Sequence, residues 1–435
     1  MSGTRAATGP PSVDAGPTRA PALDDQPGGE PRFFYGWVVV AAVFVMLAVS
    51  SGLGFYGLTV YLRALSIEHS FSIGAVSAAT ALFFLVTGVV GLPVASLIGR
   101  HDPRPTIAAG AVCGGLALLL LGRVNAVWQV YPAYALFGFG FAASSLVPGT
   151  TLVTRWFSRR RSMALSVAST GLSAGGVLIT PVVAAVVTRF GIATAAPWLA
   201  LAYVLGIVPV TALLMRSHPA SMGLQPDGDH DGQARMTAAP GTPAAAAVRT
   251  RFFWAVTVAH LLAMLCQVGG IAHLYNLVAE RGSSATAATA VSVLAVASLL
   301  GRLAGGWVVT RVPMRAFTAA LMVAQAVSLG ALAAGHSPLT LLVAAGAFGI
   351  TVGNLLMLHP LLLAERFGVR DYGKIYSRSS VVATLGIASG PFVLGLLHDL
   401  LGGYGVALSL VAILSLLAAL ALRASGPVHL VHAAD

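Results

Sequence analysis

The stretch "SVLAVASLLGRLAGGWVV", residues 292–309, is almost entirely apolar or small, and one full charge, Arg302, lies inside it. A membrane span needs about 20 mostly apolar residues to cross a hydrocarbon core of roughly 30 Å. The stretch therefore has the composition of a membrane-spanning helix. A charged side chain near the centre of a bilayer costs at least roughly 2.5–3.5 kcal/mol, so the presence of Arg302 needs a specific explanation.

The whole chain has the composition of a polytopic membrane protein. Its 435 residues are 57% hydrophobic and only 9% charged, and their mean hydropathy is +0.85, whereas soluble proteins carry about 25% charged residues. Cys113 and Cys266 both fall in apolar segments, so neither a disulfide nor a metal site is expected. The chain contains no phosphate-binding loop or catalytic constellation, which argues against an enzyme, and no cofactor is expected.

Twelve segments are long and apolar enough to span a membrane, and together they predict an all-α membrane protein. These segments lie near 35–62, 73–98, 105–122, 127–153, 162–188, 194–215, 252–278, 285–309, 316–335, 338–363, 374–398 and 403–422. A Pro-, Gly- and Asp-rich linker at 216–250 divides the chain into two six-helix bundles, residues 33–215 and 251–423. We expect residues 1–32 to be a disordered cytoplasmic tail and 424–435 a second tail.

A weak internal repeat supports this division into halves. "GRHDPRP" follows the second segment and "TRVPMRA" follows the eighth, each with two arginines four residues apart. Two similar six-span halves joined by a cytoplasmic linker are typical of secondary transporters, whose substrate site lies between the halves.

The placement of the basic residues predicts the topology. Of the 25 Lys and Arg residues, four lie in loops on one side, at positions 63, 123, 189 and 281, and Arg302 and Arg378 lie on neither side. The other nineteen lie on the side of both termini, which is therefore expected to be cytoplasmic. We expect a multi-pass monomer in the plasma membrane, specifically a bacterial inner membrane. Basic loops such as "RWFSRRR" (155–161) then contact lipid headgroups and not nucleic acid.

Arg302 is the strongest candidate for a binding residue. It lies nine residues before Arg311, which places it roughly 13 Å into the membrane. No Asp or Glu occurs in the middle of any predicted span, so its partner could be an anionic substrate, because a guanidinium binds a carboxylate through two parallel hydrogen bonds. The alternative is a structural arginine that carbonyl and hydroxyl groups satisfy.

Other polar residues in the spans are weaker candidates. Arg378 either reaches the same cavity from span eleven or extends to the cytoplasmic surface. His273, in the outer half of span seven, is the candidate for proton coupling, since a histidine titrates near neutral pH; the alternative is a hydrogen-bonded histidine that lines the cavity. His260 and His359 are weaker candidates for the same role. Further candidates for lining the cavity, or alternatively for ordinary helix packing, are Asn276, Tyr56 and Asn354.

From residue 33 to 423 the chain resembles the major facilitator superfamily. The resemblance rests on the six-plus-six arrangement and on the short basic loops after spans two and eight, where that superfamily keeps a Gly-x-x-x-Asp-Arg-x-Gly-Arg type signature. Here Gly99 and Thr310 occupy the usual Asp positions, while the arginines are present. The resemblance implies transport by rocking of the two halves about a site near the middle of the membrane.

A narrower resemblance is to the monocarboxylate porter and oxalate–formate antiporter branch. The stretches that carry it are "YGWVVV" (35–40), "WFSRRRSMALSVASTG" (156–171) and "HLYNLVAERGSSATAATAVSVLAVASLLGRLAGGW" (273–307). The arginine of span eight binds the substrate carboxylate in that branch, which implies the same role for Arg302. A second basic residue in span eleven helps with dicarboxylates, which points to Arg378.

Two alternative functions remain open from the sequence. The first is export of a drug or secondary metabolite on the same fold, although the Gly-Pro-x-x-Gly-Gly run that marks span five of drug–proton antiporters is absent: "GLSAGGVLITPVV" (171–183) stands there. The second is a sensor or membrane enzyme, for which the chain carries no output domain or catalytic motif.

Overall fold

The computed structural model describes residues 3, 34–158, 160–228, 241–368 and 371–425. These residues form helices joined by short loops, and Gly241 and Gly368 form an isolated β-bridge. The predicted tail at 1–32 (apart from Gly3), positions 229–240 of the predicted linker and residues 426–435 of the second tail lie outside the described residues.

The helices of the first half begin at α1 and end at α8. They are α1 (Gly36–Ser50), η1 (Ser51–Phe55), α2 (Gly57–Glu68), α3 (Ile73–Arg100), α4 (Pro103–Leu121), α5 (Val127–Ala143), α6 (Leu146–Trp156), α7 (Arg161–Ala174), η2 (Gly175–Ile179) and α8 (Thr180–Leu214). The π-helical turns η1 and η2 lie within longer membrane spans, so α1, η1 and α2 together make one span.

The second half follows the linker, which contains the short helices η3 (Pro219–Met222), η4 (Pro226–Gly228) and α9 (Ala244–Ala247). Its helices are α10 (Arg251–Arg281), α11 (Ser284–Val308), α12 (Met314–Ala334), α13 (Pro338–Phe367), α14 (Tyr372–Leu401) and α15 (Tyr404–Arg423). Several spans begin where a side-chain oxygen accepts a backbone N–H of the first turn, which satisfies a donor that the helix leaves free. These N-cap residues include Ser72, Asp102, Thr250, Ser283 and Ser337.

Twelve membrane spans follow from these helices, as the sequence predicted. Among the described residues, 11 helical segments are long and apolar enough to cross a membrane, and one of them, Met163–Leu214, is 52 residues long. Gly191 interrupts that segment with φ 76° and ψ 161°, a backbone conformation that is not helical and that glycine adopts without a Cβ clash. The segment is therefore two spans, and the total is twelve.

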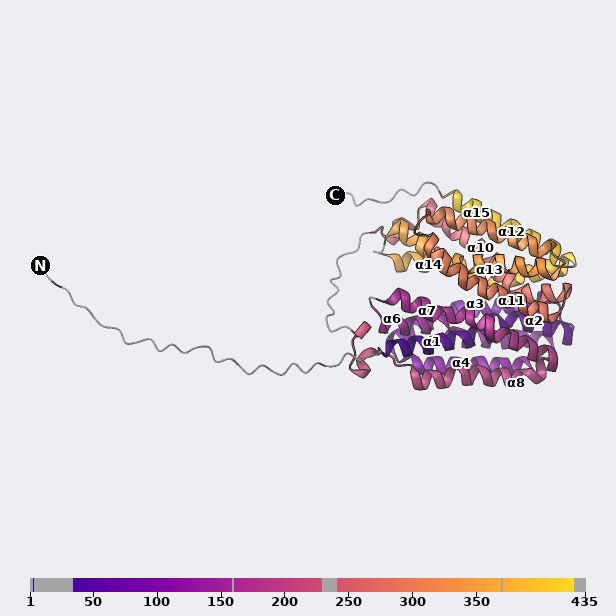
Figure 1. The fold of residues 1–435 in the computed structure, drawn as a ribbon, viewed down its shortest axis with the longest axis horizontal. Coiled ribbons are helices and arrows are strands. Elements are labelled where there is room, and N and C mark those ends of the chain that lie inside the picture. The colour runs from indigo at the N-terminus through magenta and orange to yellow at the C-terminus, as the bar shows by residue number, and fades with distance from the viewer. Residues whose placement is uncertain (1–2, 4–33, 159, 229–240, 369–370, 426–435) are drawn as a thin grey trace. The chain divides into compact units, whose positions relative to one another are not determined.

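The two halves repeat the same helix pairing. In the first half, α1 packs on α7, α3 on α5, and α4 on α8. In the second half, α10 packs on α14, α11 on α13, and α12 on α15. Each pair of the first half corresponds in order to a pair of the second, so the molecule consists of two pseudo-symmetric six-helix bundles, which Figure 1 shows in indigo to magenta and in orange to yellow.

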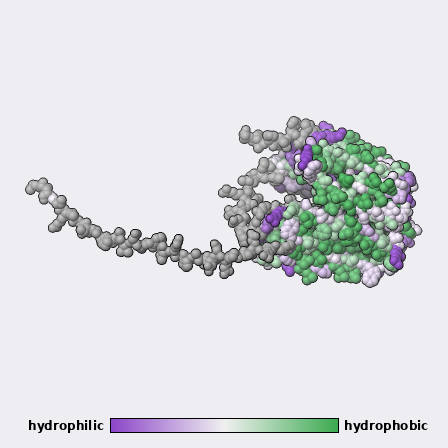
Figure 2. Space-filling model, in the orientation of Figure 1, coloured by the Kyte–Doolittle hydropathy of each residue, from purple (hydrophilic) through white to green (hydrophobic). Residues whose placement is uncertain are grey.

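The halves meet along three pairs of spans. They are α3 with α14, α2 with α10, and the span of α7, η2 and α8 with α11. We call the linker side the end of the bundles that carries the described loop residues 101–102, 157–158, 160, 215–228, 241–250, 309–313, 368 and 371. The opposite side is the end that carries 69–72, 122–126, 282–283, 335–337 and 402–403. Figure 2 shows apolar residues over the helices and hydrophilic residues mainly near their ends, as a membrane protein requires.

Candidate functional site

Arg302 lies on α11 at a close crossing with α13. Its Nε donates to the carbonyl oxygen of Gly353 at 3.2 Å, and its side chain is only partly buried. The remaining N–H donors of the guanidinium have no acceptor, and no carboxylate pairs with it, among the described residues. The protein thus fixes the orientation of the guanidinium through one bond and leaves most of its donors free for another molecule.

Small residues allow α11 and α13 to approach this closely. A Cβ added at Gly353 would lie 2.0 Å from the carbonyl oxygen of Ser298, and one added at Gly301 would lie 2.7 Å from that of Ile350. Membrane helices pack through such small residues because the backbones can then touch. The glycines therefore set the position of Arg302 against α13.

Asn354 belongs to this crossing and holds it together. Its Nδ2 donates to the carbonyl oxygens of Gly301 at 2.8 Å and Ile350 at 2.9 Å. Its Oδ1 is buried with no hydrogen-bond partner among the described residues and packs against Gly305. Asn354 thus lies next to Arg302 but acts on the backbone of α11 rather than facing an open cavity.

Tyr56 approaches the same region from the first half of the chain. It follows η1, is 4% exposed, and packs with Ala295 of α11 against Gly176 of η2. Its phenol is close enough to the Arg302 guanidinium for the two groups to interact electrostatically. The structure therefore brings Tyr56, Arg302 and Asn354 together where the two halves meet.

His273 and Asn276 lie elsewhere, nearer the opposite side. His273 is 1% exposed, and its Nε2 donates to the carbonyl oxygen of Pro391 at 3.0 Å and lies 3.1 Å from the hydroxyl of Ser77 in the first half. Its Nδ1 lies 2.9 Å from the hydroxyl of Tyr404. Because a carbonyl can only accept, neutral His273 carries its proton on Nε2, and Tyr404 donates to Nδ1.

The contact between the two halves around His273 continues to the helix ends on the opposite side. Arg63 donates to the Oδ1 of Asn276 at 3.0 Å and lies 3.8 Å from Glu280. The backbone N–H of Gly74 donates to Asp399 at 2.7 Å. These bonds all join the first half to the second, so they close the opposite side. Sequence reasoning missed Arg63 and Asp399 because both lie at span ends, where charged residues are ordinary.

Arg378 is exposed on α14. On the same helix, Ser380, Ala383 and Ile387 line a cavity within the second half. At 100° per residue, Arg378 lies about 140–200° around the helix from these three residues. Arg378 therefore points away from the cavity within the second half, and its role in substrate binding stays a prediction.

The cavity within the second half contains the two weaker histidine candidates. It has a volume of about 90 Å³ and lies between α10, α13 and α14. The rings of His260 and His359 stack there with centroids 4.5 Å apart and planes at 19°. His359 lies six residues beyond Gly353 on α13, so the histidine pair is about 9 Å closer to the linker side than the Arg302 contact.

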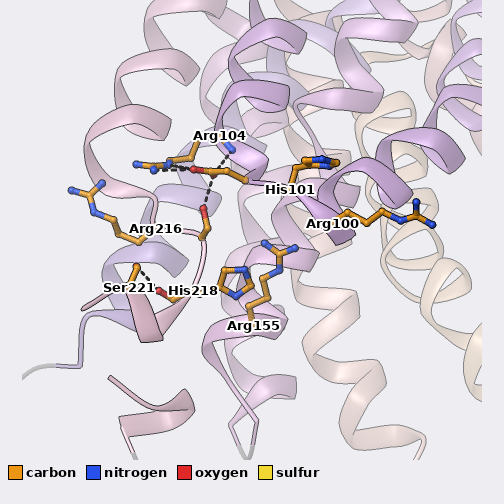
Figure 3. Close-up of a pocket in the computed structure, with 9 residues that line it drawn as sticks. Arg100, His101, Arg104, Arg155, Arg216, His218 and Ser221 are labelled. Atoms are coloured by element: carbon orange, nitrogen blue, oxygen red, sulfur yellow. Dashed lines mark hydrogen bonds and ion pairs between the residues drawn. The ribbon is translucent and has the colours of Figure 1, made fainter. Parts of the chain in front are cut away.

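A second pocket, of about 350 Å³, lies at the linker side of the first half. Figure 3 shows Arg104, Arg155 and Arg216 around it, projecting from different elements. Asp102 pairs with Arg104 at 2.8 Å and accepts from Ser217. Partial burial raises the pKa of Asp102, but the hydrogen bonds from Arg104 and Ser217 lower it by more, so that the pKa is about 2. This pocket is remote from the arginine at the middle of the membrane.

Two pseudo-symmetric six-helix bundles, with a largely unpaired guanidinium where they meet, are the architecture of a secondary transporter. The Major Facilitator Superfamily model matches residues 43–329 and 271–430, and the chain belongs to that family. The chain is 28% identical over 408 residues to monocarboxylate transporter 11 of Mus musculus, covering 88% of this chain and 85% of that one.

Two further comparisons agree with this assignment. The chain is 27% identical over 388 residues to monocarboxylate transporter 13 of Bos taurus, which covers 85% of this chain and 84% of that one. The fold is similar to that of a mutant of the nucleoside transporter NupG, with a TM-score of 0.70, 12% identity, and coverage of 90% of this chain and 99% of that one. The latter likeness concerns the fold alone.

Proposed function

We propose that this protein carries small organic anions, monocarboxylates foremost, across the plasma membrane by alternating access, with the linker side in the cytoplasm. The observation that carries the proposal is Arg302. It is a guanidinium at membrane depth with one protein hydrogen bond and no acidic partner among the described residues. A carboxylate would supply the missing charge and accept two parallel hydrogen bonds.

The surroundings of Arg302 suit a small anion. Tyr56 offers a hydroxyl from the first half of the chain, while Arg302 belongs to the second. An anion bound between them would touch both halves, which is what a rocking transporter needs from its substrate. The likeness to monocarboxylate transporters 11 and 13 supports the same substrate class.

The contact around His273 supplies one gate of this cycle. Opening toward the opposite side must separate His273 from Ser77 and Asn276 from Arg63. His273 would then meet water, and the proton-coupling role that the sequence predicts for it stays a prediction of this proposal. Asn276 acts here as a bridge between the halves.

The experiment is uptake into proteoliposomes. We would supply labelled lactate, pyruvate, formate, oxalate or acetate, with and without an inward proton gradient. Saturable uptake of one acid by the wild type, lost in Arg302→Ala, supports the proposal. Uptake of no acid by folded protein contradicts it and favours export of a larger metabolite.

A matched control is Arg378→Ala, because Arg378 is also a basic residue within a span but is exposed. We expect this variant to take up monocarboxylates at the wild-type rate. A selective loss of oxalate uptake in this variant would instead show that Arg378 assists with dicarboxylates.

A further inference from the structure

His260 lines the cavity within the second half and carries a ring nitrogen without a hydrogen-bond partner among the described residues. Its Nδ1 lies 2.9 Å from the carbonyl oxygen of Val256, one turn earlier on α10. Because a carbonyl only accepts, the neutral ring carries its proton on Nδ1, and Nε2 has a lone pair. The side chain is 0% exposed, and Nε2 has no hydrogen-bond partner among the described residues.

The cavity beside this ring can hold water. Its volume of about 90 Å³ is enough for more than one water molecule. The hydroxyl of Ser380, which also lines the cavity, is likewise buried without a partner among the described residues. Two residues that line one small cavity thus carry buried polar atoms without partners, which favours a site for water and a proton over apolar packing.

The stacked pair accepts one proton and no more. The ring of His359 lies 4.5 Å from that of His260, and two positive rings at this distance would repel strongly. The Nε2 of His359 already bonds to Ser379 at 2.7 Å, and Ser379 bonds to Thr257 at 2.7 Å. Of the two Nε2 atoms in the stacked pair, that of His359 is therefore engaged by the protein, while that of His260 has no partner among the described residues.

The charged groups around His260 are few. The titratable residues that line its cavity are His359 from α13 and Tyr376 from α14, and no acidic or basic side chain of the described residues lines it. The other helices packed on α10 carry their charged residues mostly near their ends: Arg63 and Glu68 on α2, Arg315 on α12 and Arg423 on α15. Arg302 on α11 and Arg378 on α14 are the exceptions within the spans. Helices α13 and α14 carry their other charged residues, Glu365, Arg366, Lys374 and Asp399, near their ends.

We propose that His260 is the proton-binding group of the transport cycle, an inference that rests on the proposed carriage of organic anions. Hydronium in the cavity transfers its proton to the Nε2 lone pair, an N–H bond forms, and water is released. The reverse step returns the proton to water after the halves have rocked. His273 is less suited to this role, because both of its ring nitrogens already have partners in the closed interface.

The position of His260 couples proton binding at this histidine to anion binding at Arg302. The anion at Arg302 lies about 9 Å from the level of the histidine pair, measured along α13. Because this offset is the smallest separation that the two charges can have, the negative charge favours protonation of the imidazole by at most a factor on the order of ten. Proton binding therefore strengthens anion binding by the same factor, as thermodynamic linkage requires.

The test separates anion binding from proton coupling in the full-length protein. His260→Asn keeps a donor for the carbonyl of Val256 but cannot bind a proton at neutral pH. In proteoliposomes, counterflow of labelled against unlabelled acid needs no proton gradient, and we expect it to stay within about twofold of wild type. Uptake driven by an inward proton gradient should fall at least about tenfold, with loss of the accompanying proton flux into vesicles that contain a pH dye.

A matched control is His336→Gln, because His336 is exposed in the loop before α13, and both assays should match wild type. His359→Gln gives an independent measurement if the asparagine variant does not fold. Removal of the stacked ring admits more water beside His260, so the pH midpoint of uptake should move upward by at least about half a unit.

The outcomes are distinct. No counterflow of any acid in the wild type contradicts the proposed function itself. Wild-type counterflow without any response to a proton gradient overturns the role of His260, as does wild-type gradient-driven uptake in His260→Asn. If His260→Asn does not fold, an unchanged pH midpoint in His359→Gln overturns it too.

Discussion

The side chains of Arg302 and Asn354 each donate a hydrogen bond to the backbone of the opposite helix where α11 crosses α13. The Arg302 side chain donates to the carbonyl of Gly353, the residue before Asn354, and the Asn354 side chain donates to the carbonyl of Gly301, the residue before Arg302. The contact therefore holds the arginine in one orientation without neutralising its charge. A preoriented, unpaired guanidinium is what a carboxylate site requires.

Replacement of Arg302 should strongly weaken the binding of the transported acid. Hydrogen bonds to charged groups contribute about 1.5–3 kcal/mol, so Arg302→Ala should raise the KM for a carboxylate at least about tenfold. Arg302→Lys keeps the charge but loses the two parallel bonds, and we expect an intermediate KM. Initial rates of uptake against acid concentration measure both effects, and an unchanged KM in the alanine variant would exclude Arg302 from the anion site.

Replacement of Gly353 should destabilise the crossing itself. A methyl group in Gly353→Ala would lie 2.0 Å from the carbonyl oxygen of Ser298, so the helices must move apart, at a cost of about 1–3 kcal/mol. Gly306→Ala is the matched control, since a Cβ there meets nothing within 4 Å, and it should be neutral or stabilising. Thermal unfolding in detergent distinguishes the two, and equal melting temperatures would contradict the packing argument.

Loss of Asp399 should loosen the opposite side. Asp399 accepts from the backbone of Gly74 and lies 3.2 Å from His398, so Asp399→Ala removes a bond between the halves. We expect backbone hydrogen exchange at residues 69–77 to quicken several-fold. Ser409→Ala, an exposed position on α15, should leave this rate unchanged. Equal exchange in both variants would mean that Asp399 does not hold the gate.

The stability that Asp102 contributes should depend on pH. Its folded pKa of about 2 lies below its ordinary value of 3.8, so its contribution is complete above about pH 4 and is lost as the pH falls through 2. Asp102→Asn should lower the melting temperature at pH 7 by a few degrees at most, because the group is partly exposed. The difference should vanish near pH 2, and a constant difference would assign the effect to something other than charge.

The twelve spans and the division into halves could be predicted from the sequence because both depend on local properties. Length and hydropathy determine whether a segment crosses the membrane, and the predicted break between residues 188 and 194 contains Gly191, where α8 divides. The depth of Arg302 also follows from simple counting along the chain. The structure confirms the major facilitator fold that this pattern and the short motifs indicate.

The grouping of the candidate residues depends instead on contacts between distant parts of the chain. Arg63 meets Asn276, 213 residues later, and Ser77 meets His273, 196 residues later. No local pattern encodes such pairs, because they depend on how whole helices cross. The sequence alone thus determined which helices form and that Arg302 lies within the membrane. Only the packing of glycines and backbone carbonyls at the crossings decided that Tyr56 and Asn354 surround Arg302, and that His273 closes the opposite side.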